Sequence, residues 1–266
     1  MNVAILLTGQ LRTYEMVKYL HMNTLINKYN ADVFLSIDIN NKLQCIPKNN
    51  TIVTNEETIN NAIEYFKPID YFILNDYDEE FNKFKNNTVD IIHLRIFFQQ
   101  YYIVKQAYKL LINHINKTNK KYDLIIRLRF DQYLFSNEMP IINNLYNNIE
   151  ERILFNKTNI EILKNYTDYN KILFDEINDN CIYVLGFGDC HHYKYCNDQF
   201  FYHNEKILIK MYNFYDNLIN LDMYCNNNNI GNMGARIECM LYNYLTIFNN
   251  ITIKKSNISG IFIREY

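Results

Sequence analysis

The chain has 266 residues, of which 48% are hydrophobic and 21% charged, a composition typical of a globular protein rather than a disordered or fibrous one. Its 27 basic and 29 acidic residues nearly cancel and leave a net charge of −2. This balance excludes the strong positive charge expected of a nucleic-acid-binding protein. A small or weakly charged partner fits it better.

The sequence shows neither a signal peptide nor a membrane span. Val3–Leu7 is apolar, but it lacks a basic flank, and Gly9, Gln10 and Arg12 follow at once. No run approaches the roughly 18 apolar residues needed to cross a bilayer. We therefore expect a cytoplasmic protein, or one of the host cytoplasm or virion if its source is viral. The six cysteines form no tight framework, so free thiols are expected.

Strands alternate with helices through the first half of the chain. Apolar runs predict buried strands at Val3–Leu7, Ala31–Ile37, Ile69–Leu74 and Leu124–Leu128. Helical spacing predicts helices after Thr13, which could cap the first of them, over Glu56–Phe66 and over Ile91–Ile115. The acidic, Asn-rich stretch Asn75–Asn87 is predicted to be a loop. This alternation favours βαβ units and a mainly parallel sheet.

The pattern loosens beyond Pro140. Strands are predicted at Ile153–Phe155, Ile182–Leu185, Gln199–Tyr202 and Ile251–Ile253, and helices at Glu205–Leu218 and Ala235–Phe248. There is no internal repeat and no linker. We expect one α/β domain over 1–266, with a regular half, 1–135, and a looser half, 136–266.

Two strand ends carry unusual polar residues, and ligands of open α/β sheets bind beyond the carboxyl ends of the strands. The first is Thr8–Arg12. Gly9 allows a tight turn or the close approach of a ligand, and Gln10 and Arg12 supply donors suited to a base or a phosphate. The alternative is an ordinary strand-to-helix turn with a surface arginine.

The second strand end lies in Tyr122–Asp131. Period-two alternation places Arg127, Arg129 and Asp131 on one side of the strand if the strand stays extended. Such charges at the end of a buried strand are costly unless they are paired or bound. A diphosphate with a divalent cation would bind both kinds of charged side chain: arginine would bind the phosphate oxygens and aspartate would bind the metal. A structural ion pair between Arg129 and Asp131 is the alternative.

Three further segments give weaker signals. Asn197–Gln199 precedes aromatic residues and suits a sugar site, with a plain turn as the alternative. Glu238 lies on a predicted helix and is a candidate general base or an ordinary exposed carboxylate. Cys190–Cys196, with two histidines, matches no standard zinc spacing, so an exposed loop is favoured.

Taken in order, these segments resemble the GT-A-type glycosyltransferases of capsule and surface-glycan clusters in bacteria and large DNA viruses. That family has a Ser/Thr-Gly-Gln-x-Arg turn, a strand with a bulky-Asp-hydrophobic pair, a Gln-bearing helix, a Tyr-Asp-x-x-x-Arg-x-Arg-x-Asp strand, an Asn-Asp-Gln-Phe segment and a Glu-bearing helix. The matching segments here are Thr8–Arg12, Ala31–Phe34, Gln99–Tyr101, Tyr122–Asp131, Asn197–Phe200 and Arg236–Glu238. The resemblance covers nearly the whole chain, and Tyr122–Asp131 is its strongest element.

The resemblance implies a GT-A-like, Rossmann-like fold and transfer of a sugar, of the hexosyl or deoxyhexosyl class, from a nucleotide-diphosphate sugar such as a UDP-sugar to a glycan hydroxyl. The nucleotide would bind to the first half and the glycan acceptor to the second. The donor-binding residues that it implies are Thr8, Gly9, Gln10, Arg12, Gln99, Arg127 and Arg129. In an inverting transfer Glu238 or Asp198 would be the catalytic base. A retaining transfer would need a different arrangement, and the sequence does not decide between the two.

The resemblance also implies a divalent cation, Mn²⁺ or Mg²⁺, held on the diphosphate by Asp131. The family's Asp-x-Asp motif is here Arg129-Phe130-Asp131, which lacks the first acid. Metal dependence therefore stays open, because arginines could neutralise the leaving diphosphate unaided. The missing acid also leaves room for a non-catalytic carbohydrate-binding or scaffold protein with the same fold. A nucleotidyltransferase would need a Gly-rich phosphate loop, and this chain, with 6 Gly, has none.

Overall fold

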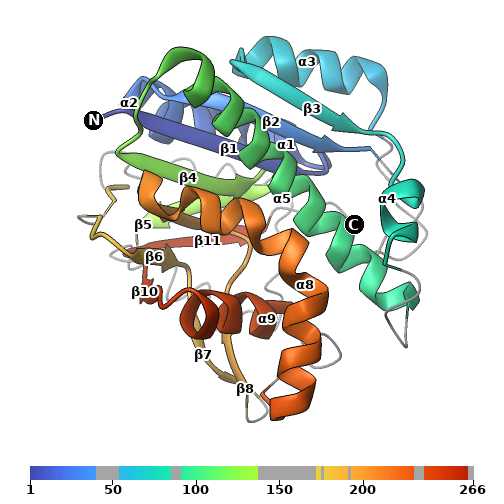
Figure 1. Ribbon diagram of the computed structural model, residues 1–266. Helices are drawn as coiled ribbons and strands as arrows, with labels where there is room; N and C mark the ends of the chain where they lie inside the picture. Colours follow the sequence, from blue (N-terminus) through green and yellow to red (C-terminus); the bar gives the residue numbers. More distant parts are fainter. Residues whose placement is uncertain are drawn as a thin grey trace, which may run out of the picture.

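A seven-stranded sheet forms the framework of the molecule (Figure 1). The computed structural model describes residues 1–39, 54–84, 91–136, 172–174, 177–190, 193–230 and 237–262. The strand order is β10-β6-β9-β4-β1-β2-β3. Neighbouring strands pair in parallel except where β9 pairs antiparallel with β4 and β6. The sheet is thus mainly parallel, as the alternation of strands and helices predicted.

The elements follow the predicted order closely. The strands of the sheet are β1 (Val3–Gly9), β2 (Asp32–Asp38), β3 (Asp70–Leu74), β4 (Leu124–Arg129), β6 (Cys181–Val184), β9 (Phe201–His203) and β10 (Thr252–Lys255). The helices are α1 (Tyr14–His21), α2 (Asn27–Tyr29), α3 (Glu56–Phe66), α4 (Asp78–Asn82), α5 (Ile91–Thr118), α8 (Leu208–Asn228) and α9 (Ile237–Asn243). A π-helical segment, Met22–Ile26, joins α1 to α2, a 3-10 turn, Glu205–Ile207, precedes α8, and a second π-helical segment, Tyr244–Phe248, follows α9.

Some predictions needed correction. The stretch expected to be a loop at Asn75–Asn87 contains α4, whose first turn holds three acidic residues that favour a helix N-terminus. Thr13 stands at the N-cap of α1, but its side chain makes no capping hydrogen bond. The predicted strand Ile153–Phe155 lies outside the described residues.

Two small sheets were not predicted. The strands β5 (Gln132–Ser136) and β11 (Ile258–Phe262) pair antiparallel, and β7 (Phe187–Cys190) and β8 (Tyr193–Cys196) form a hairpin. The boundary expected at 135/136 falls inside β5, and the large sheet takes strands from both halves of the sequence.

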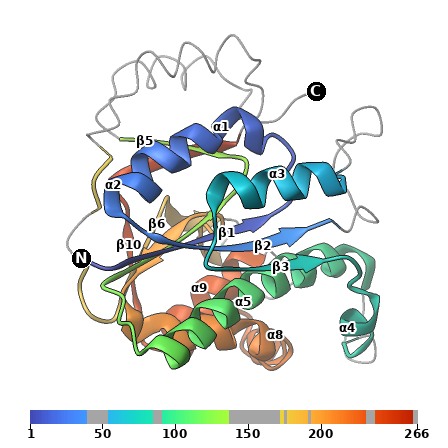
Figure 2. The ribbon, with the colours of Figure 1, turned by 90° about the horizontal axis from the view of Figure 1, so that it is seen from above.

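Helices cover both faces of the large sheet. Seen from above, α1 and α3 lie on one side of β1, β2 and β3, and α5, α8 and α9 lie on the other (Figure 2). Strand β1 is buried on both faces: Val3, Ile5 and Leu7 pack in the core under α1 and α3, while Ala4 and Leu6 pack in the core under α5 and α8. This double burial explains why the strand is a continuous apolar run.

The strand order reverses beside β1. From β1 the chain adds β2 and β3 on one side, and then returns through α5 to place β4 on the other side. The carboxyl ends of β1 and β4 therefore flank the crevice in which α/β sheets of this kind bind ligands.

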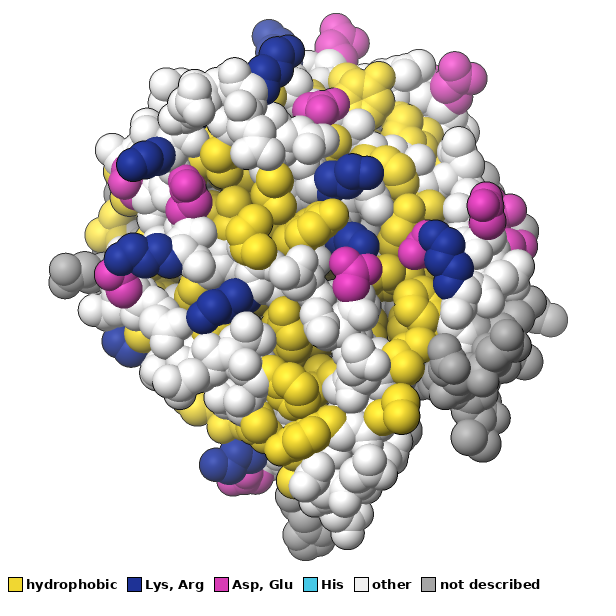
Figure 3. All heavy atoms as spheres, viewed as in Figure 1, with side chains coloured by type: hydrophobic (Ala, Val, Ile, Leu, Met, Phe, Trp, Pro, Cys, Tyr) yellow, Lys and Arg dark blue, Asp and Glu magenta, His cyan; other side chains and the backbone are white. Residues whose placement is uncertain are grey.

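Charged side chains are scattered over the face that α5 and α8 form. In the space-filling view of this face, Lys and Arg lie among Asp and Glu, with hydrophobic side chains exposed between them (Figure 3). This face thus shows no broad basic surface, in keeping with the near-neutral net charge.

Candidate functional site

A pocket opens at the carboxyl ends of β1, β2 and β4. Its walls come from the end of β1 and the turn after it, the last residue of β2, the middle of α5 and the end of β4. The lining residues are Thr8, Gly9, Gln10, Arg12, Asp38, Gln99, Gln100, Ile103, Arg127 and Arg129. All seven residues that the resemblance assigns to donor binding are in this set. Their shared position is a finding, and their role stays a prediction.

The turn after β1 depends on Gly9. Its φ of +111° lies in a region that side chains rarely adopt, whereas a Cβ built there would meet no atom within 4 Å. Backbone conformation, rather than lack of space, therefore requires the glycine. Beyond it, the Arg12 Nε donates to Gln10 Oε1 at 2.8 Å, so the two polar side chains of the turn are held together at the pocket.

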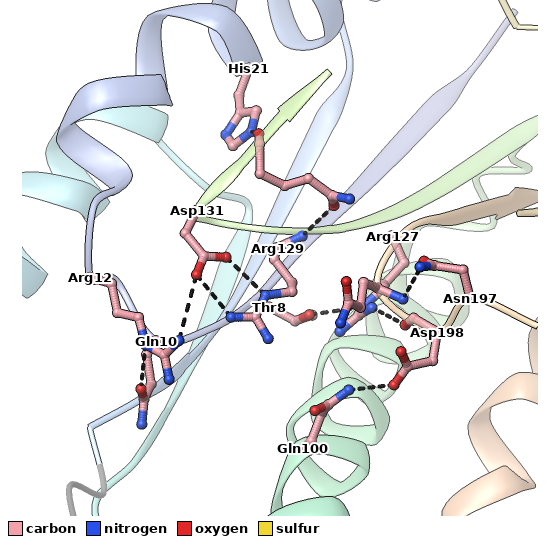
Figure 4. A network of polar contacts seen from close by, with 12 residues as sticks. Thr8, Gln10, Arg12, His21, Gln100, Arg127, Arg129, Asp131, Asn197 and Asp198 are labelled. Carbon is pink, nitrogen blue, oxygen red and sulfur yellow. Dashed lines mark hydrogen bonds and ion pairs between the residues drawn. The ribbon is translucent and has the colours of Figure 1, made fainter. Parts of the chain in front are cut away.

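Arg127 is built into the wall of the pocket and is only 2% exposed. Its Nε donates to Thr8 Oγ1 at 3.0 Å, and its Nη1 donates to the backbone carbonyl of Asp198 (Figure 4). The guanidinium also lies 5.5 Å from the centroid of the Phe201 ring. Burial lowers the pKa of Arg127 to about 10, while the charge of Asp198 opposes this shift. The side chain is therefore still a cation at neutral pH.

Arg129 and Asp131 form a two-pronged ion pair. The Arg129 Nε donates to Asp131 Oδ1 at 2.8 Å, and the Arg129 Nη2 donates to Oδ2 at 2.9 Å (Figure 4). A second guanidinium, that of Arg12, has its Nη1 3.8 Å from Oδ2. Burial alone would lower the pKa of Arg129, but the charge and hydrogen bonds of Asp131 outweigh it and raise the pKa.

This pair is the structural alternative that the sequence left open. The strand does not stay extended through Asp131, which was the condition for a shared face, because β4 ends at Arg129 and the chain turns at Phe130 and Asp131. The turn brings the Asp131 carboxylate back onto Arg129. Asp131 itself is fully buried and is not among the pocket-lining residues.

The residues present fit a divalent cation at Asp131 poorly. Both carboxylate oxygens accept hydrogen bonds from Arg129, and a cation there would face two guanidinium groups. Among the described residues, no group of three or more His, Cys, Asp and Glu side chains could hold a metal ion. The last histidine, His203, is buried between Tyr108 and the carbonyl of Asn204. The two histidines between Cys190 and Cys196 lie outside the described residues. A metal at Asp131 stays an untested prediction.

One acidic lining residue was missed in the sequence. Asp38 is the last residue of β2, and its Oδ2 accepts a hydrogen bond from Gln99 Nε2 at 2.8 Å. The signal was available, because Asp38 is a polar residue at the carboxyl end of a predicted parallel strand, beside the equivalent end of β1.

Asp198, between β8 and β9, is not a lining residue but contacts two of them, Gln100 and Arg127. It is 3% exposed, and its Oδ2 accepts from Gln100 Nε2 at 2.5 Å and from the Tyr101 hydroxyl at 3.1 Å. Within the described part of the chain, Oδ1 accepts no hydrogen bond. Two side chains of α5 thus fix one carboxylate oxygen of Asp198. The backbone carbonyl of the same residue accepts the hydrogen bond from Arg127.

Glu238 is near Asp198 but does not line the pocket. It is half-buried in the first turn of α9, and its backbone carbonyl is 4.0 Å from Cys196 Sγ. Burial raises the pKa of the Tyr101 hydroxyl, and the charges of Asp198, Cys196 and Glu238 raise it further. The negative charges of both candidate bases therefore raise the pKa of the same buried tyrosine. Arg236, the other residue of that motif, lies outside the described residues.

No family model matches the sequence. No curated protein matches it. Among solved structures, the chain is similar to the crystal structure of a glycosyltransferase involved in the glycosylation of the major capsid of PBCV-1, at 10% sequence identity and a TM-score of 0.36, over 96% of this chain and 81% of that one.

The fold is Rossmann-like. This conclusion comes from the seven-stranded, mainly parallel sheet with helices on both faces and the reversal of strand order beside β1. Among the described helices, none is both long enough and apolar enough to cross a membrane.

Proposed function

We propose that this protein is a glycosyltransferase of the GT-A type that moves a hexosyl or deoxyhexosyl group from a nucleotide-diphosphate sugar, such as a UDP-sugar, to a glycan hydroxyl. One observation carries the proposal: the polar motifs at the ends of β1 and β4 and on α5 line a single pocket where the strand order reverses. Their order along the sequence is that of the glycosyltransferase motifs.

The chemistry of the lining suits a diphosphate. Three of its side chains, Arg12, Arg127 and Arg129, are guanidinium groups, whose planar arrays of N–H donors match phosphate oxygens. The amides of Gln99 and Gln100 add groups that recognise a base or sugar hydroxyls. In this proposal residues 1–135 hold the nucleotide, and 136–266 supply the acceptor side of the site.

Asp198 is the proposed general base. Gln100 and Tyr101 anchor its Oδ2, which leaves Oδ1 for the hydroxyl of the acceptor. The carboxylate takes the proton of that hydroxyl, the acceptor oxygen bonds to the anomeric carbon, and the bond from that carbon to the diphosphate breaks. The diphosphate leaves with the electron pair, and the arginines stabilise its developing charge. Glu238, farther from the pocket lining, is the second candidate for the base.

Thermal-shift measurements with a panel of sugar nucleotides test this proposal. A ligand that binds only the folded state raises the melting temperature, so at least one sugar nucleotide should do so. Arg12→Gln, which removes a lining guanidinium, should reduce the shift. Lys206→Gln, at an exposed position 69% accessible and outside the pocket, is the matched control.

Release of the nucleotide diphosphate distinguishes an enzyme from a binding protein. The enzyme should liberate it slowly with water as acceptor and faster with a suitable glycan. Binding without any release would favour the non-catalytic carbohydrate-binding or scaffold protein. If no sugar nucleotide binds at all, the proposed function is wrong.

A further inference from the structure

The three guanidinium groups of the pocket are each held by a neighbour. Arg127 donates to Thr8 Oγ1, and Arg12 donates to Gln10 Oε1. Arg129 donates two hydrogen bonds to the Asp131 carboxylate. Cationic donors that are fixed before a ligand arrives lose little freedom when they bind it.

Carboxylates are scarce on the same lining. Among the described residues of this lining Asp38 is the one acidic side chain, and one of its oxygens already accepts a hydrogen bond from Gln99. Asp131 is fully buried behind Arg129, with both oxygens engaged. A dication placed at Asp131 would have to displace Arg129 and would then lie beside two guanidinium groups, where like charges repel.

We propose that the pocket binds the diphosphate of its donor through Arg12, Arg127 and Arg129 without a divalent cation. In this arrangement Asp131 is a positioning residue: it orients the Arg129 guanidinium rather than ligating a metal. The inference rests on the proposed function and specifies how the same site neutralises its substrate. It differs from the cation-bridged arrangement that the resemblance implies.

Calorimetric titration with inorganic pyrophosphate tests the inference, because this probe carries the diphosphate without base or sugar. The protein is treated with EDTA, and the titration is done in EDTA and again with Mn²⁺. The expected result is binding in EDTA, with an affinity that Mn²⁺ changes by no more than about twofold. Electron paramagnetic resonance of Mn²⁺ with protein and pyrophosphate together should show no protein-bound ion.

Variants assign the binding to the arginines. Arg12→Gln is the first choice, because Arg12 is partly exposed and its loss leaves the buried pair intact. Removing one charge-assisted contact should weaken pyrophosphate binding about tenfold. Lys206→Gln should bind as the unmodified protein does. Asp131→Asn distinguishes a residue that orients Arg129 from one that ligates a metal. If Asp131 only orients Arg129, the effect of Mn²⁺ on pyrophosphate affinity should be the same in this variant as in the unmodified protein.

The outcomes separate the inference from the proposed function. Binding that needs Mn²⁺ would overturn the inference and leave the glycosyltransferase proposal in place, and loss of that Mn²⁺ effect in Asp131→Asn would make Asp131 the ligand. Unchanged affinity in Arg12→Gln and in Arg129→Gln, both folded by circular dichroism, would also overturn it. If neither pyrophosphate nor any sugar nucleotide binds under either condition, both proposals fail.

Discussion

The two ends of β4 both gather charged side chains, but in different surroundings. At the amino end, the Asp32 carboxylate accepts hydrogen bonds from Lys120 Nζ at 2.5 Å and from the Tyr122 hydroxyl, and the side chains of Asp32 and Lys120 are 17% and 35% exposed. At the carboxyl end, Asp131 is fully buried and Arg129 is 14% exposed.

Burial is what distinguishes these two clusters. A partly exposed pair such as Lys120–Asp32 contributes about 1 kcal/mol or less, since water still reaches both charges and solvates them when they separate. A buried pair has to overcome the desolvation of both ions, so it is maintained only where both partners are present. The cluster at the carboxyl end also adjoins a pocket at the reversal of strand order, and our proposal places the functional site at this end for both reasons.

The largest effect is expected at Asp198. Asp198→Asn keeps an oxygen that accepts from Gln100 and Tyr101 but removes the base, so turnover should fall by about 10² to 10⁴. Binding of the nucleotide diphosphate should change by less than a few-fold. Glu238→Gln is the matched variant and should lower turnover less than about tenfold. Steady-state rates measure both, and the reverse ranking would make Glu238 the base.

The buried ion pair should matter next. Asp131→Ala leaves the Arg129 guanidinium largely buried without its carboxylate, and breaking a buried pair costs about 3–5 kcal/mol of unfolding free energy. Transfer should be lost as well, because Arg129 is no longer oriented. Urea denaturation gives the stability and a transfer assay the activity. A variant with full activity and unchanged stability would contradict both claims: that the ion pair stabilises the protein and that the active site lies at this end of β4.

Acid should destabilise the protein through two interior histidines. Burial lowers the pKa of His21 and of His203 to about 4, against about 6.5 in the unfolded chain. Between these values the unfolded state binds more protons, so their stabilising contribution is present above pH 6.5 and is lost as the pH falls toward 4. At pH 5 the loss is about 2 kcal/mol for each ring.

Urea midpoints at pH 7 and pH 5 measure this effect. The carbonyl of Asn204 only accepts, so His203 Nδ1 donates to it at 2.7 Å and Nε2 accepts from the Tyr108 hydroxyl at 2.7 Å. Protonation removes that acceptor. In His21→Gln the decrease in stability between the two pH values should be about 2 kcal/mol smaller. An equal decrease in both proteins would show that His21 does not titrate as its burial predicts.

The smallest effect is expected at the amino end of β4. Lys120→Gln removes one partner of the partly exposed cluster and should change the unfolding free energy by no more than about 1 kcal/mol. It should leave sugar-nucleotide binding unchanged, because Lys120 does not line the pocket. A loss as large as that of Asp131→Ala would contradict the contrast between the two ends.

Much of the framework was evident in the sequence, because local physics specifies it. Apolar runs without helical spacing located β1, β2, β3 and β4, and Asn55 caps α3, whose bounds were predicted in full. Polar residues after β1 and along β4 predicted the edge of the sheet where the pocket lies, since carboxyl ends of parallel strands share one edge.

Only the tertiary structure decided which of these residues meet. Pairing of β1 with β4 in register brings Thr8 beside Arg129 and Leu6 beside Arg127, and packing of α5 brings Gln100 onto Asp198, 98 positions away. No local pattern encodes such long-range contacts, because they arise from strand order and helix packing rather than from neighbouring residues. The turn at Phe130 and Asp131 is the sharpest case. Alternation alone left two possibilities for Asp131, a metal ligand or an ion pair with Arg129. The folded backbone returns it to Arg129, where mutual neutralisation stabilises both buried charges.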